Sequence, residues 1–147
     1  MKALVAFDGT EGSKKALSFA MKLDSVLDEL IITYVYPNVV AATAPAEAYV
    51  PPAMLREQDR LGDSIIETAR QFVEHSTIQS SFVKLDAGGD QVARVIINAA
   101  KERGAHMIIT GTRKLGGLSK ILLGSVSSEI LKQTTIPVIV VPPDYEG

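Results

Sequence analysis

The stretch MIITGTRKLGGLSKILLGS, residues 107–125, predicts a strand, then a glycine-rich loop, then the start of a helix. Its first residues are apolar and β-branched, which favours a buried strand. A strand–loop–helix junction leaves free N–H groups and the positive end of the helix dipole facing one place. Glycines let the backbone approach a ligand there. The stretch therefore predicts an anion site, and phosphate is an anion that such sites hold.

The charge and spacing of this loop favour a phosphate ligand. The chain carries a net charge of −2, yet residues 103–128 contain no Asp or Glu and hold four cations: Arg103, Arg113, Lys114 and Lys120. Neither G-x-G-x-x-G nor the P-loop G-x-x-x-x-G-K-[ST] is present. The pattern is G-x2-K-x9-G-S, from Gly111 to Gly124 and Ser125. The alternative to a phosphate site is that these glycines only form turns ahead of a helix. The clustered cations argue against that alternative.

Strand-like and helix-like segments alternate along the chain. Short apolar, β-prone segments predict strands at residues 2–7, 30–36, 81–85, 106–110 and 137–141. Apolar residues at helical spacing predict helices at about 16–21, 53–74, 90–104 and 126–132. Asp90 is the expected N-cap of the third helix, and Gly104 is expected to close it. The sequence therefore predicts an α/β fold, a doubly wound five-stranded parallel sheet with helices on both faces.

Ligands of doubly wound sheets bind beyond the carboxyl ends of the strands, where the strand order reverses. Asp8 follows the first predicted strand and Val35 ends the second. The Asp8 carboxylate suits ribose hydroxyls or an adenine amine, and its alternative role is to cap the next helix together with Thr10. A backbone group at Val35 suits a base, although the pattern around Val35 also fits the core.

Two further features bear on the site and its surroundings. Ser125 and Ser127 either donate to phosphate oxygens or serve as an N-cap and a solvated first turn. Residues 38–52 show no periodicity and exceed the usual connection length, so a lid is expected there. The following helix is expected to bury one face, made of Leu61, Ile65, Ala69 and Phe72.

Composition narrows the class of protein. With 147 residues and 46% hydrophobic content, the chain is expected to form one domain over residues 1–147. It has no Cys and two separate His, too few for an ordinary metal site. Prolines interrupt its longest uncharged stretch, residues 30–46, and no signal segment is visible, so a cytoplasmic protein without a membrane partner is expected. Mild acidity and few aromatics argue against nucleic acid.

Together these segments resemble the universal stress protein family over essentially the whole chain. Residues 3–17, ALVAFDGTEGSKKAL, look like its first strand and helix. Residues 110–113, TGTR, and 122–127, LLGSVS, look like the two ends of its ATP loop, G-x2-G-x9-G-[ST]. The middle glycine of that motif is Lys114 here. A left-handed backbone at this position costs a non-glycine residue about 1–2 kcal/mol, whereas the Lys114 ammonium adds a cation beside the anion.

The resemblance implies that the loop wraps the phosphates of ATP, with Mg²⁺ accompanying the nucleotide. Asp8 then contacts the ribose and adenine side, Val35 meets the base, and the phosphates lie against Gly111, Gly124, Ser125 and Val126. The residues expected to contact the nucleotide also include Arg113 and Lys114, through their positive charges, and Ser127, through its hydroxyl. The resemblance also implies a homodimer, formed by antiparallel pairing of the last strands across a two-fold axis.

The leading hypothesis is an ATP-binding, dimeric stress regulator that responds to nucleotide and is not an enzyme. One alternative is a family member that does not bind ATP and acts through protein–protein interaction, and Lys114 is the residue that separates the two. A weak ATPase would need a base near the γ-phosphate, which the sequence does not reveal. A phosphoacceptor receiver domain is set aside, because Asp8 stands without the clustered acids such a domain needs.

Overall fold

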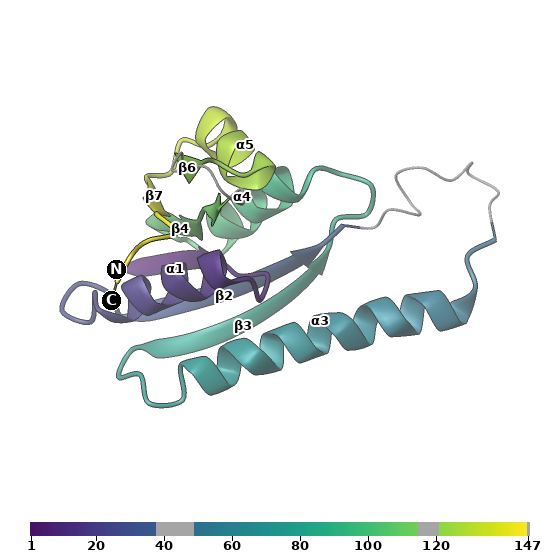
Figure 1. Ribbon diagram of the computed structural model, residues 1–147, viewed down its shortest axis with the longest axis horizontal. Coiled ribbons are helices and arrows are strands. Elements are labelled where there is room, and N and C mark those ends of the chain that lie inside the picture. The colour runs from purple at the N-terminus through teal and green to yellow at the C-terminus, as the bar shows by residue number, and fades with distance from the viewer. Residues whose placement is uncertain (38–48, 115–120, 147) are drawn as a thin grey trace.

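The computed structural model of the protein describes residues 1–37, 49–114 and 121–146 (Figure 1). Its main sheet is parallel and five-stranded, in the order β3-β2-β1-β4-β7. The strands are β1 (Lys2–Ala6), β2 (Glu29–Tyr36), β3 (Gln79–Asp86), β4 (Met107–Gly111) and β7 (Val138–Val141). The helices are α1 (Glu11–Met21), α3 (Pro52–Phe72), α4 (Val92–Glu102) and α5 (Ser125–Gln133). The predicted α/β fold with a five-stranded parallel sheet is confirmed.

Helices cover both faces of the sheet, as the apolar strands predicted. Successive side chains of a strand point to opposite faces, so Val5 and Ile32 belong to the core beneath α1 and α3. Leu4 and Ile31 belong to a second core beneath α4 and α5. Figure 1 shows α3 running beside β3, while α4 and α5 gather near β4 and β7. Burying each such aliphatic side chain contributes about 1.5–3 kcal/mol, which holds the layers together.

The strand order reverses next to β1. The chain passes from β1 to β2 and β3 on one side of the sheet, and then crosses to β4 and β7 on the other side. In doubly wound folds the crevice at this reversal is the place where ligands bind. The topology therefore puts the residues after β1 and β4 at the predicted position for a site.

The start of α1 packs backbone to backbone against the end of β4. A Cβ atom on Gly111 would overlap the carbonyl group of Gly12, and a Cβ on Gly12 would overlap the carbonyl oxygen of Thr112. Neither glycine has a positive φ, so close approach and not backbone conformation requires a glycine at each position. The spaced glycine motif predicted that Gly111 lets a ligand approach, and it gave no sign of the contact with Gly12.

The predicted N-cap of α4 was wrong. The N-cap residue is Gln91, and it makes no side-chain capping bond. Asp90 instead closes a turn, because its N–H donates to the carbonyl of Ala87 at 2.8 Å. Its carboxylate lies 3.1 Å from the guanidinium of Arg94. Asp90, which local capping rules assign to the N-cap, therefore belongs to the turn before the helix.

The predicted buried face of α3 was also partly wrong. Leu61 is 55% exposed and Phe72 is 39% exposed, whereas Gly62 and Ala69 are buried. A Cβ on Gly62 would lie 2.8 Å from Cδ of Lys84, so the glycine lets the helix approach β3. The Lys84 ammonium then lies 2.6 Å from two carboxylates of the helix, Asp59 and Asp63.

Part of the glycine-rich loop forms regular structure where only a loop was expected. Strand β5 (Arg113–Lys114) pairs antiparallel with β6 (Ile121–Leu122). Most of the expected lid at residues 38–52, together with Lys120, lies outside the described residues. The side chains of Arg113 and Lys114 are likewise outside what the structure describes.

Replacing either glycine of the α1–β4 contact should destabilise the protein strongly. Gly12→Ala and Gly111→Ala force a methyl group into backbone atoms, and overpacking of this kind costs about 1–3 kcal/mol or more. Urea denaturation of each variant measures the loss. Gly124→Ala is the matched control, because among the residues that the structure describes its Cβ would meet no atom closer than 3.7 Å. Equal stability of Gly12→Ala and the control would contradict the packing explanation.

Candidate functional site

A cavity of about 300 Å³ lies at the carboxyl ends of β1, β2 and β4. Small-molecule sites usually occupy about 300–1,000 Å³. Helix α4 and the first turn of α5 contribute to its walls. Seven of the nine predicted site residues line it: Asp8, Val35, Gly111, Gly124, Ser125, Val126 and Ser127. The other two, Arg113 and Lys114, form β5, and their backbone alone is described.

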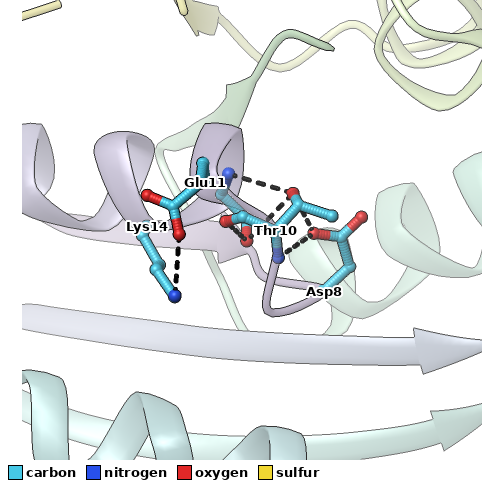
Figure 2. Close-up of polar contacts among 5 residues, drawn as sticks. Asp8, Thr10, Glu11 and Lys14 are labelled. Carbon is cyan, nitrogen blue, oxygen red and sulfur yellow. Dashed lines mark hydrogen bonds and ion pairs between the residues drawn. The ribbon is translucent and has the colours of Figure 1, made fainter.

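Asp8 organises the turn between β1 and α1. Its Oδ1 accepts hydrogen bonds from the N–H of Thr10 at 3.0 Å and from the Thr10 hydroxyl at 2.5 Å (Figure 2). Thr10 is the N-cap of α1, and its Oγ1 accepts from the N–H of Ser13 at 3.4 Å. Gly9, with a φ of +80°, allows the reversal. The capping alternative for Asp8 is therefore present, acting through Thr10, in a residue that also lines the cavity.

The carboxylate of Asp8 also influences the electrostatics beside the cavity. Burial raises the pKa of the Tyr34 phenol above its usual value, and the charge of Asp8 adds to the rise. Tyr34 thus keeps its proton at neutral pH. The nearby ammonium of Lys14 lies 2.8 Å from the Glu11 carboxylate in the first turn of α1 (Figure 2). This pair also lowers the pKa of Glu11, chiefly through the hydrogen bond from Lys14.

The first turn of α5 borders the cavity without a side-chain cap. Gly124 is the N-cap residue, and it has φ −62° and ψ 163°, values open to any residue. A Cβ there would lie 3.7 Å from Oγ of Ser127, an ordinary contact. The Ser127 hydroxyl donates to the carbonyl of Gly124 at 3.0 Å. Within the described residues, neither packing nor backbone conformation therefore requires a glycine at Gly124, whereas packing requires one at Gly111.

The cavity gathers the buried polar side chains of the described part of the chain. There are five of them, all hydroxyls, and each lines the cavity: Ser13, Thr33, Thr110, Thr112 and Ser127. Sequence reasoning identified Ser127 alone. Thr33 could have been identified from the sequence. It stands two residues before the predicted site residue Val35 in β2, and hence on the same face of the strand.

Lys114 does not carry the strain that its place in the loop suggested. Its backbone pairs with Ile121 in the β5–β6 ladder, and among the described residues no side-chain-bearing residue has a positive φ. The cost of a left-handed conformation therefore does not arise at Lys114 in this structure.

The described ranges hold neither a metal cluster nor a membrane-spanning helix. No group of three or more His, Cys, Asp or Glu in these ranges is placed to hold a metal ion. No helix in the same ranges has the length and apolar character that crossing a membrane requires.

The sequence and the fold match a known family. The model of the universal stress protein family matches residues 1–142. The chain belongs to this family. It is 34% identical to universal stress protein YxiE of Bacillus subtilis, over 95% of this chain and 97% of that protein.

Solved structures of universal stress proteins share the fold. One from Burkholderia pseudomallei superposes with a TM-score of 0.74 at 22% identity, covering 96% of this chain and 95% of that one. An Arabidopsis thaliana member with AMP bound superposes with a TM-score of 0.68 at 16% identity, covering 97% of this chain and 91% of that one. A member in complex with cAMP superposes with a TM-score of 0.65 at 19% identity, covering 98% of each chain.

Gly124→Ser should leave the stability of the ligand-free protein unchanged or raise it. The backbone angles and the free space accept a serine, and serine is at least as good an N-cap as glycine, by a few tenths of a kcal/mol. Thermal denaturation without ligand measures the effect. A loss of more than about 1 kcal/mol would show that the fold itself requires Gly124, contrary to the geometry.

Proposed function

We propose that this universal stress protein binds ATP in the cavity at the carboxyl ends of β1, β2 and β4. The observation that carries the proposal is Gly124, a glycine that no contact among the described residues requires, at an uncapped helix start beside the cavity. A side chain there would stand between a ligand and the first-turn N–H groups of α5, which are suited to phosphate oxygens. The AMP and cAMP complexes of structural neighbours support a nucleotide in this fold.

The lining suggests one orientation for the nucleotide. The phosphates lie toward Gly111 and the start of α5, where Ser125 supplies an exposed hydroxyl. The proposal also assigns positive charge to Arg113 and Lys114, whose side chains lie outside the described structure. The ribose lies near Asp8, and the base lies toward Val35. Mg²⁺ accompanies the phosphates of ATP, which supply oxygen ligands themselves.

The protein acts in this proposal as a nucleotide-responsive regulator and not as a fast enzyme. Two of the cavity hydroxyls, Ser13 and Ser127, donate to backbone carbonyls at 2.9 and 3.0 Å. Neutral hydroxyls in such bonds can hold a ligand, but they are poor general bases at neutral pH. The alternative function is an interaction module that does not bind ATP, and nucleotide titration separates the two.

ATP with Mg²⁺ should raise the melting temperature and give a saturable signal in calorimetric titration. A ligand that binds only the folded state at 100 times its Kd stabilises that state by about 2.7 kcal/mol. Gly124→Val should stay folded and lose this binding, because its side chain blocks the amides of α5. No shift of the wild type at millimolar ATP would favour the interaction module. Wild-type affinity in Gly124→Val would place the phosphates elsewhere.

We further propose a homodimer through β7, which lies at the edge of the sheet as expected. Three of its residues, Val138, Ile139 and Val140, are only partly buried, and the strand carries no charge. Edge strands offer unpaired N–H and C=O groups, so an uncharged apolar edge favours association with another strand. A second copy pairing antiparallel across a two-fold axis satisfies both edges at once.

Val140→Lys should shift the protein toward monomer. The new ammonium would be placed in the contact between the two edge strands, where charges, and Lys especially, oppose pairing. Sedimentation velocity at tens of micromolar measures the change. Thr135→Lys is the control, because Thr135 is exposed and precedes the strand. A monomeric wild type, or an unchanged dimer in Val140→Lys, would refute this interface.

A further inference from the structure

The buried hydroxyls of the cavity differ in how well their own fold satisfies them. Ser13 and Ser127 make hydrogen bonds of ordinary length with helix-start carbonyls, at 2.9 and 3.0 Å. Thr33 donates to the carbonyl of Ile31 at 3.4 Å, which is long against the usual O–H···O range of about 2.5–3.0 Å. Thr33 is also the most buried of the five, at 1% exposure. Its hydroxyl is therefore deeply buried, yet its hydrogen bond within the protein is weak.

Thr33 lies on the floor of the cavity, in a row across the sheet. It pairs with Ala6 of β1, and both residues line the cavity. Two positions earlier on the same face of the same strands stand Leu4 and Ile31, which are buried aliphatic residues of the α4 and α5 core. The row thus changes from large aliphatic groups to an alanine and a threonine where the cavity begins.

Fold stability alone does not explain a hydroxyl at this position. Valine has nearly the same shape as threonine and suits the centre of a sheet. A buried hydroxyl without a good partner costs about 1–3 kcal/mol. The weak bond to Ile31 recovers only part of that cost, so the hydroxyl of Thr33 is best explained by a partner that enters the cavity.

The end of the cavity around Thr33 has the character of a site for a heterocyclic base. If the phosphates lie at α5, the base lies toward β2, and Val35, Val92 and Ile96 supply apolar side chains to the lining on this face of the sheet. Tyr34 also contributes to the lining, but its ring packs on the α3 side, where a Cβ on Gly62 would lie 3.5 Å from Cε1. On the opposite face of β2, Thr33 therefore supplies the hydroxyl beside the apolar side chain of Val35.

We propose that Thr33 is a specificity-determining residue whose hydroxyl accepts a hydrogen bond from the exocyclic amine of a bound adenine. This inference rests on the proposed nucleotide site. The Thr33 hydroxyl donates its hydrogen to the carbonyl of Ile31. The lone pairs of its oxygen therefore remain to accept a hydrogen bond from a ligand. The complementary ligand group is an N–H donor, which adenine presents at its 6-amino group. Purine, which lacks that amine, leaves the hydroxyl unmatched.

The test measures Kd by calorimetry for ATP and for purine riboside triphosphate, which differs only in lacking the 6-amino group. The wild type should bind ATP about tenfold more tightly than the analogue, as expected for one buried hydrogen bond. Thr33→Val should bind both nucleotides with equal affinity, while Thr33→Ser should keep the discrimination. Thr68→Val makes the same chemical change on α3, where its hydroxyl bonds to Ser64 at 2.9 Å outside the cavity, and should behave as the wild type.

The outcomes separate this inference from the function on which it rests. Wild-type protein that binds neither nucleotide would overturn both the nucleotide site and the role of Thr33. Wild-type protein that binds ATP but does not discriminate against the analogue would overturn the role of Thr33 alone. Discrimination that persists in Thr33→Val would do the same. Thermal denaturation of Thr33→Val should show a folded protein at least as stable as the wild type, so that lost discrimination is not lost structure.

Discussion

The backbone contact between Gly12 and Gly111 fixes the geometry on which the cavity depends. It brings the first turn of α1 against the end of β4 with no side chain between them. The turn that carries Asp8 and Thr10 is thereby held beside the loop that follows β4. Because protein interiors are close-packed, a methyl group at either glycine would separate two walls of the same cavity. The turn after β1 and the end of β4, which both line the cavity, are held together by this approach.

The glycines of the chain show how far sequence reasoning reaches. Gly111 and Gly124 both belong to one spaced motif, and a motif cannot say which of them serves the fold. The structure separates them, since Gly111 is needed for a long-range contact with Gly12, whereas no packing contact in the described part of the chain needs Gly124. Gly12 was missed for the same reason: its partner lies about a hundred residues away along the chain, and local patterns carry no information about such contacts.

The rest of the fold divides along the same line. Alternating apolar segments and helical spacing were enough to predict the order of elements and the parallel sheet, because both depend on local periodicity. The cap at Asp90 was wrong because a local turn uses this residue, whose N–H donates to the carbonyl of Ala87. The face containing Leu61 was wrong because a tertiary contact decided it, the close approach of Gly62 to Lys84 of β3. The carboxyl-end rule predicted most of the site, yet the hydroxyls inside the strands escaped it, since threonine is ordinary in a strand.

The cavity and the edge of the sheet are joined by one short backbone connection. The N–H of Thr112 donates to the carbonyl of Val141 at 3.1 Å, and its hydroxyl reaches the same oxygen at 3.3 Å. Thr112 lines the cavity, while Val141 ends β7. If phosphates bind beside Gly111 and a second copy pairs with β7, both events act on this connection. Linkage is reciprocal, so any preference of the nucleotide for one arrangement of these residues would appear equally as a nucleotide-dependent dimer affinity.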